Sequence, residues 1–284
     1  AFSLSPAGLR AQEGGEATKK ILEAFQGARY EESAKLAAEF IKANPQSPNL
    51  ASAYLVQARS YYNLSKWPEA IAAYEKVASI AQEKDIKEEA AYYIAQSAAS
   101  QADAAPEKSA EEKKGFENAL QKISAFLKGY PDSTSRTEAF LLQSRVYLLL
   151  ARYAESSQAL DEARKSDKSK NFTDDIDYLQ AFAEARRADA LLADFKKTEA
   201  EAALARAGQI YAKLAASGSP ALAAEATLQL ASLDLAARRF DEAIARLRTV
   251  SGKDELIAKL EINLAPLRAE LSRETNPSSE KLKR

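Results

Sequence analysis

The chain has 284 residues, and its 40 basic and 41 acidic side chains leave a net charge of −1. The two signs are interleaved along the sequence, which gives no electrostatic reason for binding nucleic acid. The sequence contains no Cys and no His, which excludes disulfides, thiolate chemistry, the commonest general base and the commonest metal ligand. We therefore expect no nucleic-acid partner, no metal and no other cofactor.

The chain opens on the stretch AFSLSPAGLRAQ, which runs into a polar Gln-Glu-Gly-Gly segment. Two interpretations stand side by side: the end of an export signal, or an unstructured end. In both cases we expect residues 1–13 to form a flexible segment. The sequence leaves open whether a signal peptide or a lipid anchor precedes it. No apolar run approaches the roughly 18 residues that span a bilayer, so we expect no transmembrane segment.

A short pattern recurs along the rest of the chain: a bulky aromatic residue, a small residue three positions later, and then an apolar stripe. Copies start at Tyr30, Trp67, Tyr153 and Phe240, and a looser copy starts at Phe116. A repeat period between 20 and 50 residues is typical of solenoids built from one repeated unit. The gap after Tyr153 leaves room for one further, degenerate copy. The pattern therefore predicts an all-α solenoid of about six units.

The predicted units follow one another from residue 14 to residue 255. They cover about 14–47, 51–84, 88–130, 137–170, 174–216 and 224–254. The third unit contains an insertion at 103–114, which either extends the helices or forms a loop. The fifth is degenerate because no bulky residue holds the anchor position. We expect a capping helix at 256–273, which Pro266 kinks or breaks, and a disordered tail at 274–284.

The second unit carries a family resemblance. Its apolar and small residues fall on one face of each of two helices, at Tyr54, Ala58 and Tyr61 and at Trp67, Ala70, Tyr74 and Val77. This 34-residue pattern resembles the tetratricopeptide repeat. The resemblance implies a right-handed α-solenoid of helix-turn-helix units, whose first helices line a concave surface that binds partner peptides.

The same resemblance assigns candidate groove residues. They combine aromatic, aliphatic and cationic side chains, and they are Leu55, Arg59, Tyr62, Asn63, Tyr92, Gln96, Leu141, Arg145 and Leu148. Such a mixture suits a peptide with apolar anchors and one carboxylate. The alternative for the leucines is packing against the next repeat. Chaperone adaptors of this family grip a carboxylate with Lys and Asn, and these residues are absent from the corresponding positions here.

The junctions after the first and third units suggest a cellular location. Residues 40–47 read FIKANPQS and residues 126–133 read FLKGYPDS. Both resemble junctions of bacterial envelope repeat proteins, namely outer-membrane barrel-assembly lipoproteins and periplasmic cell-division coordinators. The alternative is generic helix punctuation by Pro and Ser. We expect an exported protein of the bacterial periplasm or envelope, with the cytoplasm as the open alternative.

Acidic clusters are the remaining candidates for chemistry. They lie at Glu31–Glu32 and at Asp174, Asp175 and Asp177, and a charged run covers Glu107–Lys114. We expect helix starts or solvated faces at these places, and therefore no enzyme. The predicted function is a non-catalytic scaffold that binds a partner peptide or protein. The alternatives are a self-assembling structural protein, including a homo-oligomer, and a domain of a larger secretion component or enzyme.

Overall fold

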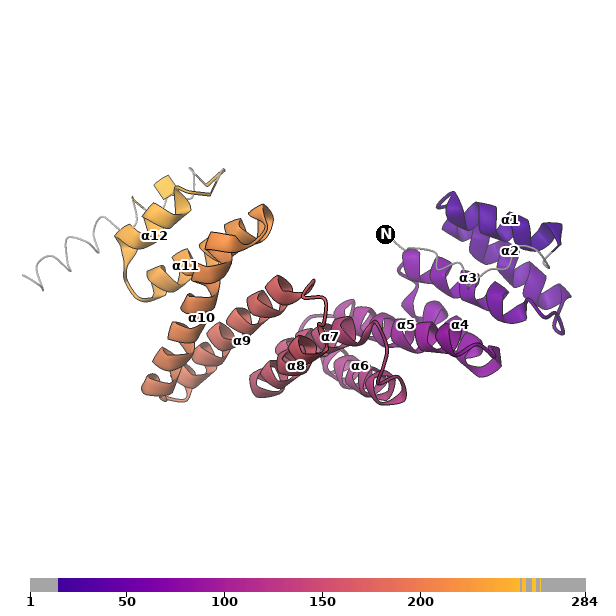
Figure 1. Cartoon of the computed structure of the whole chain (residues 1–284), viewed down its shortest axis with the longest axis horizontal. Helices are drawn as coiled ribbons and strands as arrows, with labels where there is room; N and C mark the ends of the chain where they lie inside the picture. The colour runs from indigo at the N-terminus through magenta and orange to yellow at the C-terminus, as the bar shows by residue number, and fades with distance from the viewer. Residues whose placement is uncertain (1–14, 251, 254–256, 259–260, 262–284) are drawn as a thin grey trace, which may run out of the picture. The chain divides into compact units, whose positions relative to one another are not determined.

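The computed structural model describes residues 15–250, 252–253, 257–258 and 261. Within these residues the chain forms twelve α-helices and no strand (Figure 1). The helices are α1 (Glu16–Gln26), α2 (Tyr30–Ala43), α3 (Leu50–Asn63), α4 (Trp67–Ile80), α5 (Lys84–Asp103), α6 (Ala110–Gly129), α7 (Arg136–Leu149), α8 (Tyr153–Ser166), α9 (Thr173–Ala193), α10 (Lys197–Ser217), α11 (Pro220–Ala236) and α12 (Phe240–Leu247). They pair into six helical hairpins, so the predicted all-α repeat fold is confirmed.

The helices fall into two compact units. Unit 1 covers residues 1–168 and contains α1 to α8, and unit 2 covers residues 169–284 and contains α9 to α12. Inside each unit, every helix packs against the next one in the chain. The division falls between the fourth and fifth hairpins. The predicted solenoid boundaries at 14 and 255 stay a prediction. The segments 1–13 and 274–284, and most of the predicted capping helix 256–273, lie outside the described residues.

A repeated turn joins the two helices of a hairpin. In the second hairpin, Ser65 adopts a left-handed backbone with φ of 57°, and the amide of Lys66 donates to the carbonyl oxygen of Tyr61 at 2.9 Å. The second helix begins at the next residue, which is the aromatic anchor Trp67. Left-handed positions recur at Ala28, Ala151, Phe195 and Arg238. This turn reverses the chain and so sets the two helices antiparallel.

The small residue three positions after each anchor is fully buried. This holds for Ser33, Ala70, Ala119, Ser156 and Ala243. Two helices that cross closely leave no room for a larger side chain at the crossing point. The buried hydroxyl of Ser33 donates to the carbonyl oxygen of Ile21 at 3.1 Å, so it is satisfied. The degenerate fifth unit keeps the same device, because Ala200 is fully buried three positions after Lys197.

The insertion at 103–114 extends the helices and forms only a short turn. Both α5 and α6 have 20 residues, compared with 14 in α3 and α4. Ser109 caps α6 by accepting the amide of Glu112 at 3.0 Å, and the Glu112 carboxylate accepts the amide of Lys108 at 2.6 Å. This reciprocal cap explains why Ser and Glu stand in the charged run.

Candidate functional site

Three of the nine predicted groove residues are buried. Leu55 is part of the core with Tyr74 and Val77, and Leu141 is also buried. Arg59 is only 4% exposed. The expectation that these three side chains line an open groove is therefore corrected. The reason is that neighbouring hairpins pack closely enough to cover these first-helix positions, which was the alternative for the leucines.

Arg59 is neutralised inside the chain. Its Nε donates to Oε1 of Glu89 at 2.7 Å, and its Nη2 donates to Oε2 at 2.7 Å. This two-point pair joins α3 to α5 and occupies the donors that a partner carboxylate would need. The ion pair between Arg59 and Glu89 could not be predicted from their spacing in the sequence. It forms only because two neighbouring hairpins bring the two side chains together.

The predicted polar residues on α3 and α5 are brought together. The Tyr62 hydroxyl donates to Oε1 of Gln96 at 2.9 Å, and Nε2 of Gln96 donates to the Tyr92 hydroxyl at 2.8 Å. Asn63 turns back along its own helix and donates to the carbonyl oxygen of Arg59 at 2.7 Å. This chain of hydrogen bonds ties the two hairpins together, so these side chains have a structural role whatever they bind.

Aromatic rings surround this hydrogen-bonded chain. Tyr93 stacks on Tyr74 with ring centroids 5.5 Å apart and meets Tyr62 edge-on at 5.3 Å. Burial raises the pKa of Tyr93 to about 12, and it also raises the pKa of Tyr92. Both phenols therefore stay protonated at neutral pH and act as neutral packing groups that carry a hydrogen-bond donor.

The other two predicted groove residues lie on α7. Arg145 is exposed and Leu148 is half-buried, and the neighbouring Leu149 is 57% exposed. These side chains are accessible to a partner. The assignment of Arg145 and Leu148 to partner binding stays a prediction.

Unit 2 contains a groove that the sequence did not predict. It lies between α9, α10 and α11 and has a volume of about 770 Å³. Small residues of α10 form its floor, at Ala205, Gly208 and Ala212. Their spacing of three and four positions places them on one helix face. The groove therefore runs over a stretch of α10 with three small residues, and Glu201 and Leu204 of the same helix also line it.

Apolar and charged side chains line the walls of this groove. Leu192 of α9 and Leu233 of α11 are among the apolar ones. The charged ones include Arg186 and Asp189, which form an exposed pair with 3.6 Å between Nη1 and Oδ2. The result is an apolar channel with a polar rim, which is the usual character of a peptide-binding groove.

A buried carboxylate fixes one end of the groove. Asp234 is buried, and its Oδ1 accepts from Nε and Nη2 of Arg239 at 2.9 and 2.7 Å. Its Oδ2 accepts from Nε of Arg246 at 2.7 Å. Because both oxygens are paired, Asp234 holds α11 to α12 and serves as a structural link in the groove wall.

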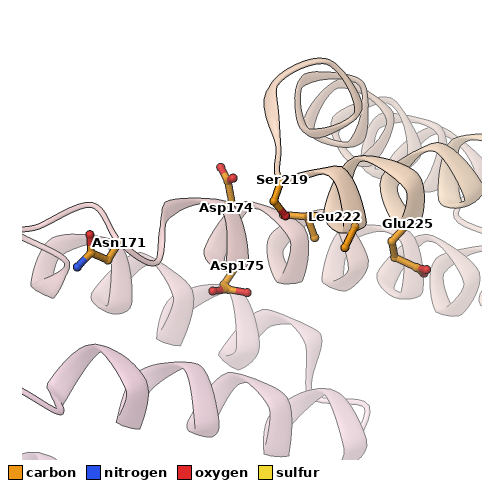
Figure 2. Close-up of a pocket in the computed structure, with 7 residues that line it drawn as sticks. Asn171, Asp174, Asp175, Ser219, Leu222 and Glu225 are labelled. Carbon is orange, nitrogen blue, oxygen red and sulfur yellow. The ribbon is translucent and has the colours of Figure 1, made fainter. Parts of the chain in front are cut away.

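A separate, smaller cavity of about 480 Å³ lies at the starts of α9 and α11. It is acidic, but its carboxylates do not converge. Asp174 and Asp175 belong to the first turn of α9 and point away from one another in Figure 2. Glu225 of α11 is engaged through Oε1, which accepts from the Tyr178 hydroxyl at 3.2 Å and from Nε2 of Gln229 at 3.0 Å. This arrangement gives no set of acidic oxygens aimed at one point.

Two further acidic residues of the predicted clusters are paired within the chain. Asp177 is buried and its Oδ2 accepts from Nζ of Lys213 at 2.7 Å. Glu32, in the first turn of α2, accepts from Nε of Arg29 at 2.7 Å. Across the described ranges, no group of three or more acidic residues could hold a metal ion. No helix in the described part of the chain is long and apolar enough to cross a membrane.

Comparison with known proteins gives structural likeness only. No protein-family model matches the sequence, and no curated protein matches it. Solved structures that match this chain include a thermophilic tetratricopeptide repeat protein from Thermus thermophilus, with 17% identity, a TM-score of 0.42, and coverage of 77% of this chain and 97% of that one.

Two further solved structures are similar at the same level. A tetratricopeptide repeat protein from Parabacteroides merdae has 16% identity and a TM-score of 0.41, and the match covers 86% of this chain and 96% of that one. BtubC from P. vanneervenii has 14% identity and a TM-score of 0.45, with 88% and 93% covered. The evidence for the repeat architecture of this chain is the series of helical hairpins described above.

Proposed function

We propose that this protein is a non-catalytic interaction scaffold, and that a segment of a partner protein binds in the groove of unit 2. The observation that carries the proposal is the groove itself, about 770 Å³ in volume with a floor of small side chains. Small residues let a partner backbone approach α10 closely, and the helices around it are already formed. Such a preformed surface spares the scaffold the entropy cost of ordering itself on binding.

The lining favours a particular kind of partner segment. Leu192, Leu204 and Leu233 offer apolar contacts, and Arg186 and Asp189 offer one charge of each sign at the rim. A segment with apolar side chains toward the floor and mixed charges toward the rim fits this surface. In unit 1, the exposed Arg145 and the half-buried Leu148 are a second accessible place for contact with a partner.

The bacterial envelope is the location we propose. Its support is the resemblance of the two junctions, each of which has a clear turn structure. Oγ of Ser47 accepts the amide of Asn49 at 3.2 Å, and Oγ of Ser133 accepts the amide of Ser135 at 3.0 Å. These serines therefore bond within the turn, and Asn49 and Ser135 hold the N-cap positions of α3 and α7.

Affinity capture with a groove-filling variant tests the proposal. The parent chain, Gly208→Phe and Gly208→Ala are used as baits for envelope and cytoplasmic extracts of the source organism, and the captured proteins are identified by mass spectrometry. An added Cβ at Gly208 meets only the Leu233 Cδ1 atom at 3.9 Å, so alanine leaves the groove open while phenylalanine fills it.

We expect a partner from the envelope extract that the parent and Gly208→Ala retain and Gly208→Phe loses by at least about tenfold, equivalent to about 1.4 kcal/mol. Equal capture by all three baits would place binding on another surface. Capture from the cytoplasmic extract alone would contradict the envelope location.

A further inference from the structure

Unit 2 presents one aromatic ring almost entirely to solvent. Phe195 lies in the turn between α9 and α10 and is 95% exposed. Its backbone is left-handed, with φ of 61°. A bulky side chain is rare in this conformation, which Gly, Asn and Asp tolerate best. The turn thus holds an apolar ring where both the backbone and the surrounding water disfavour it.

The other hairpin turns show what this position normally carries. The corresponding left-handed residues are Ala28, Ser65, Ala151 and Arg238, with φ between 55° and 58°. In those hairpins the aromatic ring comes two residues later, as the first residue of the second helix. In this hairpin that place is taken by Lys197. The ring has therefore moved from the inward anchor position to the outer tip of the hairpin.

A second apolar side chain enlarges the exposed surface at this tip. Leu192 precedes Phe195 by three positions and is 48% exposed. It also lines the groove of unit 2, so the tip and the groove lie next to each other on one surface. Together these two side chains give the tip an apolar surface that another protein can cover.

The groove has room for a ring, and its charged lining is balanced, with Arg186, Arg239 and Arg246 beside Asp189, Glu201 and Asp234. The floor residues Ala205 and Gly208 leave space for a ring. The groove lining also includes Asp189 and Glu201, whose pairs with Arg186 and Lys197 are exposed and span 3.6 and 3.8 Å. Exposed pairs of this length are weak. Both carboxylates can therefore exchange partners and meet the lysines that follow Phe195 in a neighbouring molecule.

We infer that Phe195 of one molecule inserts into the unit 2 groove of a second copy of this chain. This inference rests on the proposed function, because it uses the same groove as a binding site and names its first occupant. Two reciprocal insertions give a closed dimer, and one-way insertion gives an open chain of copies. In both arrangements self-association competes with an external partner for the groove.

Concentration-dependent mass measurement of the whole chain tests this inference. Sedimentation velocity is recorded over a concentration series for the parent and for Phe195→Asn. Asn favours the left-handed backbone, so the variant keeps its fold. We expect the weight-average mass of the parent to rise with concentration, and the association constant of Phe195→Asn to fall by at least about tenfold, or 1.4 kcal/mol. A parent that stays monomeric throughout would overturn the inference.

Two matched variants test whether self-association depends on Phe195 and the groove, or on any exposed apolar side chain. Leu149→Asn removes another exposed apolar side chain, 57% exposed and located in unit 1, and should associate like the parent. Gly208→Phe keeps the tip but fills the groove and should be monomeric. Mixing Gly208→Phe with Phe195→Asn should restore a heterodimer, since one has the intact tip and the other the intact groove. A mixture that remains monomeric contradicts the inference.

The results remain distinguishable from a failure of the proposed function. If Gly208→Phe loses its captured partner while the parent is monomeric, the scaffold function stands and the second copy is not the occupant. If self-association depends on Phe195 and Gly208 but no partner depends on the groove, the protein is a self-assembling one.

Discussion

At the scale of single residues, the pair between Arg59 and Glu89 has the largest consequence. The Arg59 guanidinium is buried, and it donates to both carboxylate oxygens of Glu89. A buried charge that loses its counter-charge keeps its desolvation cost without compensation. Substitutions at this pair therefore report on the stability of unit 1 and are unsuitable as probes of partner binding.

Glu89→Ala should destabilise unit 1 by about 3 to 5 kcal/mol, because it leaves the Arg59 charge buried and unpaired. Trp67 is the single tryptophan of the sequence and lies in unit 1. Its fluorescence during urea unfolding measures this loss without interference from unit 2.

Glu75→Ala is the matched control for this prediction. Glu75 pairs with Lys122 through a contact of 3.3 Å between exposed side chains, and we expect a loss below about 1 kcal/mol. The double variant Arg59→Met with Glu89→Leu should recover most of the stability, because apolar residues can replace a buried pair. Equal losses for Glu89→Ala and Glu75→Ala would show that the Arg59 pair contributes nothing special.

At the scale of helices, alanine substitutions at two helical glycines should have opposite effects on stability. A Cβ added to Gly208 of α10 meets only Leu233 Cδ1, at 3.9 Å. A Cβ added to Gly115 of α6 would lie 2.8 Å from the Cβ of Ala102 on α5. Gly115 therefore allows α5 and α6 to approach closely, whereas Gly208 lies on the floor of the open groove.

Gly208→Ala should stabilise α10 by about 0.5 to 1 kcal/mol, since alanine loses less backbone entropy than glycine in a helix. Gly115→Ala should be destabilising despite the same gain, because α5 and α6 must move apart. Thermal unfolding followed by circular dichroism compares the two, and Trp67 fluorescence isolates the effect of Gly115. A stabilising Gly115→Ala would mean that the two helices separate at little cost.

At the scale of the whole molecule, buried tyrosines predict sensitivity to alkaline pH. Burial raises the pKa of Tyr93 to about 12, and it raises the pKa of Tyr92 and Tyr211 as well. A tyrosine in the unfolded chain titrates near a pH of about 10. The folded state therefore binds its proton more tightly, so this stabilisation is complete below about pH 10 and is lost as the pH rises from about 10 to 12.

The free energy of unfolding of unit 1 should fall in this window by up to about 1.4 kcal/mol per pH unit for each such tyrosine. Urea unfolding at about pH 9 and about pH 11.5, followed through Trp67, measures the loss. Tyr93→Phe should show a smaller loss than the parent. An unchanged loss in Tyr93→Phe would contradict the assignment.

Much of the helical pattern could be predicted from the sequence because it depends on local spacing. An aromatic anchor followed three positions later by Ala70 or Ser33 specifies a close helix crossing, and that crossing is found in the structure. The form of the 103–114 insertion could not be predicted, because helix extension and a loop have similar local signals. The fifth hairpin was located, but the displacement of its ring to Phe195 was recognised only from the backbone of the turn.

The sequence by itself determined the all-α class, the six hairpins and their order, because a repeated pattern of apolar and small residues acts within one hairpin. Only the tertiary structure decided which side chains remain accessible. Arg59 was predicted to face a partner and is instead paired with Glu89, and the unit 2 groove arises where α9 and α11 flank the small residues of α10. The accessibility of a side chain depends on contacts between hairpins. The spacing of residues within one hairpin does not specify these contacts.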